Sequence, residues 1–120
     1  MKCLIRVPTV DVEDQLVFYR AVGFVVSDDV VDGRGIRCVT LVHPEIDGAL
    51  FNLSPVAETP VATDERILFG LVVDWGTDLP DRLIDAGFEE RDASEAPYGF
   101  WKYFRDPAGN RILITNMERW

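Results

Sequence analysis

The chain repeats one pattern at an offset of about half its length. Residues 9–24 (TVDVEDQLVFYRAVGF) and residues 72–88 (VVDWGTDLPDRLIDAGF) both pass from a strand-like run ending in Val-Asp, through a helical stretch, to Gly-Phe at the start of another strand. The second copy has one extra residue between these two signatures. A tandem repeat of this kind predicts two similar supersecondary units that bury their apolar faces together.

The helix of the first copy has clear end signals. Asp11 can accept a hydrogen bond from a free amide of the first helical turn. Leu16, Tyr19 and Val22 place apolar side chains at helical spacing, and Gly23 suits the left-handed position that follows a helix. We therefore expect a helix from Asp11 to Gly23.

The helix of the second copy has weaker signals. Thr77 or Asp78 can cap it, and Pro80 is tolerated in a first turn because its missing N–H would have had no partner there. Gly87 ends the helix. The expected buried stripe consists of Leu79, Leu83, Ile84 and Ala86.

Three strand candidates follow each helix, separated by turns rich in Gly, Asp and Pro. Each half is thus predicted to be a βαβββ unit, and the fold class is α+β. Because neither sheet can bury both of its faces alone, two sheets should pack together. We expect a single domain over residues 1–120, with a first module over about 1–56, a linker over about 57–65 and a second module over about 66–118.

Charge and cysteine content exclude several classes of function. The chain has 12 basic and 21 acidic residues, a net charge of −9, which disfavours nucleic acid and anionic membrane as partners. Cys3 and Cys38 lie apart in apolar runs, so we expect buried free thiols and neither a zinc site nor a disulfide. No membrane span or secretion signal is visible, and we expect a cytoplasmic protein.

Two stretches carry a family likeness. VDVEDQLVFYRAVGF and PYGFWKYFRDPAGNRI, in this order on a βαβββ repeat, resemble the vicinal oxygen chelate superfamily of glyoxalases, extradiol dioxygenases and bleomycin resistance proteins. The resemblance implies two modules whose curled mixed sheets enclose a cavity. It also implies a homodimer in which both subunits wall each site.

The resemblance does not extend to the metal ligands. In metal-dependent members a glutamate follows the turn aspartate by seven residues; here Asp106 is followed at that distance by Leu113. The other three ligand positions fall on Leu4, Asn52 and Ile67. A divalent ion needs three or more imidazole or carboxylate donors, so we expect no metal and no cofactor. A shift of one residue gives a set that is equally unsuitable: Cys3, Arg66 and Ile112 or Ile114.

No catalytic set is visible either. The single histidine, His43, lies in a turn, where we expect a solvated side chain, and no serine or cysteine can be assigned beside it. Adjacent carboxylates in strands, such as Glu89 and Glu90, point to opposite faces. We therefore expect a binding protein more than an enzyme.

Strand alternation predicts the lining of a pocket instead. Arg6 and Tyr103 correspond to ligand-contacting positions of the superfamily. Two alternatives stay open: the aromatic side chains either line a cavity or fill the core, and Arg6 meets either a ligand oxygen or an internal carboxylate. The predicted ligand-binding residues are Leu4, Arg6, Asn52, Ile67, Phe69, Trp101, Tyr103, Arg111 and Leu113.

The predicted function is that of a metal-free small-molecule binding protein. It would sequester an aromatic or hydrophobic antibiotic-like compound and so confer drug resistance. The acidic surface favours a cationic compound, but Arg6 and Arg111 argue against a purely cationic one, so a planar polycyclic compound with quinone or carboxyl oxygens fits better. The alternative is a lyase, a thiol transferase or another enzyme of the superfamily.

Overall fold

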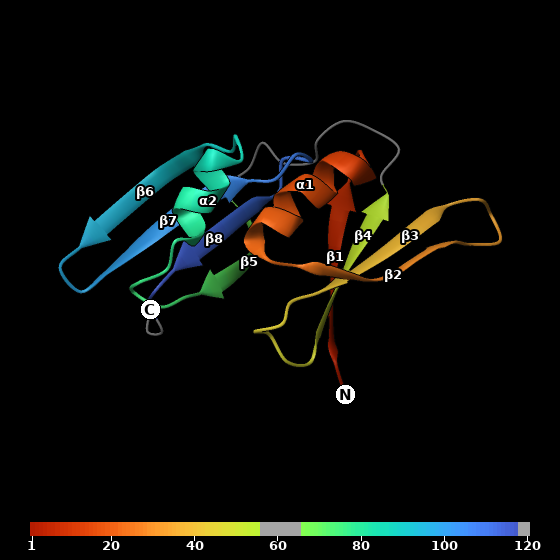
Figure 1. The fold of residues 1–120 in the computed structure, drawn as a ribbon, viewed down its shortest axis with the longest axis horizontal. Helices are drawn as coiled ribbons and strands as arrows, with labels where there is room; N and C mark the ends of the chain where they lie inside the picture. Colours follow the sequence, from red (N-terminus) through yellow and green to blue (C-terminus); the bar gives the residue numbers. More distant parts are fainter. Residues whose placement is uncertain (56–65, 118–120) are drawn as a thin grey trace.

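The computed structural model describes residues 1–55 and 66–117, and the predicted linker over about 57–65 lies outside these ranges. The first module consists of β1 (Cys3–Thr9), α1 (Val12–Val22), β2 (Val25–Val31), β3 (Arg37–Val42) and β4 (Ala49–Pro55). The second consists of β5 (Ile67–Val72), α2 (Leu79–Asp85), β6 (Glu90–Ala96), β7 (Gly99–Arg105) and β8 (Arg111–Thr115). Figure 1 shows the two modules with α1 lying near their junction.

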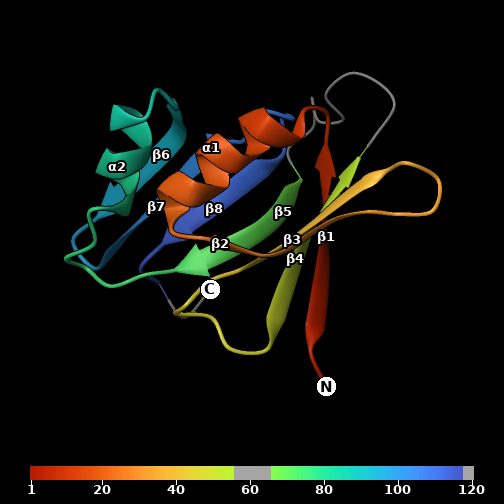
Figure 2. The ribbon, with the colours of Figure 1, turned by 45° about the vertical axis from the view of Figure 1, so that its right-hand side comes forward.

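The two sheets have the same topology, which confirms the repeat. The first has the strand order β1-β4-β3-β2 and the second the order β5-β8-β7-β6. In each, the first strand pairs in parallel with the last, and the remaining pairs are antiparallel. The predicted α+β class with two βαβββ modules is confirmed, but the two sheets remain separate in the single chain and are not closed into one (Figure 2).

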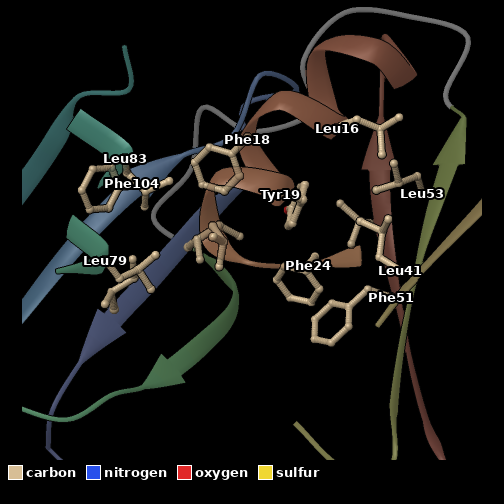
Figure 3. Close-up of a cluster of buried hydrophobic side chains, with 14 of the residues drawn as sticks. Leu16, Phe18, Tyr19, Phe24, Leu41, Phe51, Leu53, Leu79, Leu83 and Phe104 are labelled. Carbon is tan, nitrogen blue, oxygen red and sulfur yellow. The ribbon is translucent and has the colours of Figure 1, made fainter. Parts of the chain in front are cut away.

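Helix α1 has the predicted ends. The Asp11 side chain accepts a hydrogen bond of 3.0 Å from the backbone N–H of Asp14, and Gly23 has a left-handed φ of 114°. Leu16 lies toward β4 of the first sheet, whereas Phe18 lies toward α2 (Figure 3). Because α1 is apolar on two sides, it packs both modules into one core.

Helix α2 differs from the prediction. Leu79 and Leu83 are buried, but Ile84 is 47% exposed and Ala86 is also exposed. A helix of 7 residues makes only about two turns, so it offers the core a narrow stripe. The N-cap residue is Asp78, whose side chain makes no capping hydrogen bond. The hydroxyl of Thr77, one residue earlier, instead accepts a 3.2 Å hydrogen bond from the backbone N–H of Leu79.

A buried carboxyl group joins the two modules. Asp106, in the turn between β7 and β8, is 4% exposed. It accepts hydrogen bonds from Gln15 Nε2 at 2.9 Å and from the Tyr19 hydroxyl at 2.7 Å, both on α1. Asn110 of the same turn donates to Asp106 at 2.9 Å and to the carbonyl oxygen of Pro8 at 2.7 Å. The last turn is thereby fixed to the first helix and the first strand.

Burial raises the pKa values of the Asp106 carboxyl group and of the Tyr19 phenol. Desolvation raises the pKa of Asp106, although hydrogen bonds from Asn110, Tyr19 and Gln15 oppose the change. The pKa of Tyr19 is raised well above 10.0, mainly by burial of the phenol and to a smaller extent by the negative charge of the nearby Asp106 carboxylate. The Tyr19 phenol therefore keeps its proton in the folded protein.

The cysteines are free thiols, but the prediction that both are buried is wrong. Cys3 is exposed because it is the first residue of β1, beyond the packed part of the sheet, and Cys38 is half-buried. Neither of the described helices is long and apolar enough to cross a membrane.

Candidate functional site

The predicted site residues of the first sheet lie on the face turned away from the helices. Val7 and Thr9 of β1 are fully buried against the core, whereas Leu4 is 56% exposed and Arg6 is also exposed. Arg6 pairs in register with Asn52 of β4. Leu4, Arg6 and Asn52 therefore lie on the face of the first sheet that is turned away from the helices, as strand alternation predicts. We call the corresponding face of each sheet its helix-free face.

Three polar side chains form a hydrogen-bonded chain on this face. Arg6 Nε donates to the Ser54 hydroxyl at 2.8 Å, and that hydroxyl donates to Asn52 Oδ1 at 2.9 Å. Asn52 Nδ2 in turn donates to the carbonyl oxygen of Val39 at 3.3 Å. The partner of Arg6 is therefore a neutral hydroxyl group.

Leu113 lies in the middle of the helix-free face of the second sheet. In register it pairs with Gly70 of β5 on one side and Tyr103 of β7 on the other. A Cβ atom on Gly70 would lie 3.5 Å from Leu113 Cδ2, at ordinary van der Waals distance, so Leu113 lies directly beside the Gly70 backbone. Leu113, which the resemblance aligns with a metal-binding glutamate of other proteins, is apolar and 9% exposed.

A planar cation stacks beside Leu113. The guanidinium carbon of Arg111 lies 4.0 Å from the centre of the Tyr103 ring, in a cation–π arrangement. The Asp92 carboxylate lies 3.6 Å from Arg111 Nη2. Asp92 has a φ of 53°, the only positive value of a non-glycine residue in the described chain, and it sits where the β6–β7 register shifts between Arg91 and Ser94. The irregularity brings the carboxylate to Arg111.

The remaining predicted residues of the second sheet divide between its two faces. Trp101 pairs with Thr115 and Ile67 with Arg111, so both lie on the helix-free face; Trp101 is half-buried and Ile67 is 42% exposed. The prediction that Phe69 shares this face is wrong. A register shift between Ile67 and Phe69 pairs Phe69 with Ile112.

Phe69 belongs to the core. Its ring centre lies 5.1 Å from that of Phe51 and 6.3 Å from that of Tyr19. Leu71, two residues later, also packs against the core. Of the two alternatives left open by the sequence, core filling therefore holds for Phe69, whereas Trp101 and Tyr103 lie on the opposite face.

The four residues that the resemblance aligns with metal ligands offer few donor atoms for a divalent ion. Leu4, Ile67 and Leu113 carry no donor atoms. Both polar ends of the Asn52 amide are used within the first sheet. Within residues 1–55 and 66–117, no group of three or more His, Cys, Asp or Glu side chains could hold a metal ion.

Sequence reasoning missed two polar residues and placed a third wrongly. Ser54 lies two positions after Asn52, so alternation alone could have placed it beside Arg6. Asp92 could not have been found, because nothing in the sequence marks the irregularity in β6. His43, expected to be solvated, is half-buried: its Nε2 lies 3.3 Å from the carbonyl oxygen of Val22, and its Nδ1 accepts from the N–H of Glu45 at 3.1 Å.

Solved structures share this arrangement along nearly the whole chain. UcmS2 aligns with a TM-score of 0.78 at 21% identity, covering 98% of each chain. A glyoxalase/bleomycin resistance protein from Streptomyces sp. CB03234 aligns with a TM-score of 0.68 at 24% identity, covering 95% of this chain and 98% of its own. The chain has the vicinal oxygen chelate fold.

Another protein of this fold is TnmS3, an antibiotic binding protein from Streptomyces sp. CB03234. It aligns with a TM-score of 0.69 at 22% identity, covering 95% of this chain and 93% of its own. No family model and no curated protein matches the sequence. At these identities the likeness establishes the vicinal oxygen chelate fold, and the function must be argued from the residues of this chain.

Proposed function

We propose that the protein is a metal-free binding protein that sequesters an aromatic or hydrophobic small molecule and so confers resistance to an antibiotic-like compound. The observation that carries the proposal is the chemistry around Leu113. The superfamily's metal position holds a hydrocarbon side chain, and beside it Tyr103 and Arg111 form a flat stack. Such a surface favours contact with a planar ligand and offers no metal-based chemistry. The antibiotic-binding neighbour TnmS3 supports the same proposal.

The ligand surface has two parts in this proposal. The second sheet contributes the aromatic side chains Trp101 and Tyr103. The first sheet contributes the polar side chains Arg6 and Asn52 together with the apolar Leu4. Sequestration needs affinity alone, whereas catalysis needs groups that act only in a transition state. The proposed ligand-binding residues are Leu4, Arg6, Asn52, Ile67, Trp101, Tyr103, Arg111 and Leu113.

A titration with a panel of planar aromatic antibiotics tests the proposal, with tryptophan fluorescence as the readout. We expect at least one member to bind and to be recovered unchanged, as judged by mass spectrometry. Tyr103→Ala should weaken binding by about 10-fold because it removes the aromatic platform. Tyr103→Phe, which keeps the ring, is the matched control and should bind within about 2-fold of the original protein.

Two results would contradict this function. If no member of the panel changes the fluorescence, the chain does not sequester compounds of this class. If a bound compound is recovered in chemically altered form, the chain is instead a lyase, a thiol transferase or another enzyme of the superfamily. An unchanged affinity in Tyr103→Ala would place the ligand away from the second sheet.

Metal independence is tested separately. After incubation with Ni²⁺, Zn²⁺, Mn²⁺ or Fe²⁺ and removal of excess ion, elemental analysis should find far less than one ion per chain, because the four ligand positions lack the necessary donors. Binding of the aromatic compound should also be insensitive to a chelator. One tightly held ion per chain would refute the metal-free proposal.

We also propose a homodimer. The sheets do not close within one chain, and their helix-free faces expose apolar side chains such as Leu4 at 56% and Ile67 at 42%. In such a dimer the partner subunit would face these surfaces and form the second wall of each ligand site, so that the ligand lies between the two subunits. Light scattering at micromolar concentration should give twice the chain mass of 13.6 kDa, whereas a monomer mass would oppose the proposal.

A further inference from the structure

Arg6 is held in place without being neutralised. Its Nε donates to the Ser54 hydroxyl at 2.8 Å. Within residues 1–55 and 66–117, neither of its terminal Nη atoms has a hydrogen-bond partner, and no carboxylate pairs with it. The full positive charge therefore remains available at the surface of the sheet.

This arrangement contrasts with that of Arg37 and Arg82. Arg37 pairs with Asp29 at 2.8 Å and also with Glu13, and Arg82 pairs with Asp78 at 3.1 Å. A chain with 21 acidic residues has ample carboxylates to pair with an arginine whose role is only structural. At Arg6, a neutral hydroxyl takes that place.

The relay behind Arg6 fixes the direction of its guanidinium group. Because the Ser54 proton is donated to Asn52 Oδ1 at 2.9 Å, the hydroxyl is left to accept from Arg6 Nε. The Asn52 amide is itself anchored to the carbonyl oxygen of Val39 at 3.3 Å. A guanidinium group anchored through Nε keeps its two Nη atoms for a second partner, and a carboxylate is the partner that their planar geometry matches.

The surroundings of Arg6 are apolar on one side. Leu4, two residues earlier on the same face, is 56% exposed, and its register partner on β4 is the half-buried Leu50. An ordered cation beside an exposed apolar surface suits a ligand with a hydrophobic body and an acidic group at its edge.

We propose that Arg6 selects the ligand by binding an anionic oxygen of it, so that the sequestered compound is a planar aromatic acid. This inference rests on the proposed binding function and adds the chemical class of the ligand. Asn52 and Ser54 are positioning residues, which hold the guanidinium group without taking its charge. Selection of an anion is opposite to what the net charge of −9 alone would favour.

A matched pair of probes tests the inference. 2-Anthracenecarboxylate and 2-anthracenecarboxamide have nearly the same shape, but only the first is anionic at pH 7, and fluorescence anisotropy of the anthracene reports the binding of each. We expect the carboxylate to bind about 10-fold more tightly than the amide, as a charge-assisted hydrogen bond provides.

Three variants assign that preference to Arg6. Arg6→Gln should abolish it by weakening only the carboxylate, and Ser54→Ala should reduce it while the charge is kept. Arg20→Gln is the control, because Arg20 is exposed on α1, away from the helix-free face, and should keep the full preference.

If both probes bind and Arg6→Gln leaves their affinity ratio unchanged, Arg6 does not select the ligand although the binding function stands. If neither probe binds even at millimolar concentration, the proposed binding of planar aromatics fails, and this inference with it.

Discussion

Replacing Asp106 by alanine should lower the free energy of unfolding by about 2–5 kcal/mol, because more than one buried neutral donor loses its acceptor and each such group costs about 1–3 kcal/mol. The carboxyl group accepts hydrogen bonds from Gln15, Tyr19 and Asn110 side chains and from the backbone N–H groups of Ala108 and Asn110. Its removal leaves several of these buried donors without an acceptor. Urea unfolding at neutral pH measures the loss.

Asp85→Ala is the control for this prediction, because Asp85 is exposed at the end of α2 and should cost less than about 0.5 kcal/mol. Asp106→Asn keeps the shape of the side chain but replaces an acceptor by a donor, so it too should destabilise the protein. If Asp106→Ala unfolds at the same urea concentration as the original protein, the contact between the modules does not depend on this carboxyl group.

Alkaline unfolding should depend on Tyr19. The folded pKa of its phenol is raised well above the ordinary value of 10.0 by burial and by Asp106. The stabilising contribution of the protonated phenol is complete below pH 10 and is lost as the pH rises toward the folded pKa, because only the unfolded chain releases the proton. The free energy of unfolding should therefore fall by about 1.4 kcal/mol for each pH unit above 10.

Tyr19→Phe should remove this part of the pH dependence, although it lowers stability at all pH values through the lost hydrogen bond to Asp106. Urea titrations between pH 9 and pH 11 compare the slopes. Tyr98→Phe is the control, because Tyr98 is 69% exposed, and it should keep the slope of the original protein. Equal slopes for Tyr19→Phe and the original protein would show that the phenol ionises as readily when folded as when unfolded.

The fold could be predicted where local chemistry and the repeat agree. Asp11 and Gly23 mark α1 because a capping carboxylate and a left-handed glycine act within one turn of the chain. The place of Leu113 on the last strand could also be predicted, since Leu113 follows the Asp106 turn by seven residues. Both predictions depend only on residues that lie close together in the sequence and in regular structure.

The parts that failed depend on irregular strands and on distant contacts. A single register shift in β5 places the Phe69 side chain in the core, because one inserted residue moves all later side chains of the strand to the opposite face of the sheet. The stack of Arg111 on Tyr103 and its approach by Asp92 arise from three different strands. The Ser54 anchor of Arg6 follows ordinary alternation and was missed although its position was readable.

The contact between the modules also affects the order in which parts of the protein can fold during synthesis. Gln15 and Tyr19 meet Asp106 across 91 and 87 residues of chain. At a synthesis rate of about 5–20 residues per second, the ribosome would produce the helix roughly 5–20 s before its buried partner. During that interval Gln15 and Tyr19 lack the carboxylate of Asp106, so the junction between the modules is among the last contacts to form. Until the second module is made, Phe18 of α1 lacks its contact with Phe88, so an apolar side chain that the finished protein buries stays exposed during synthesis.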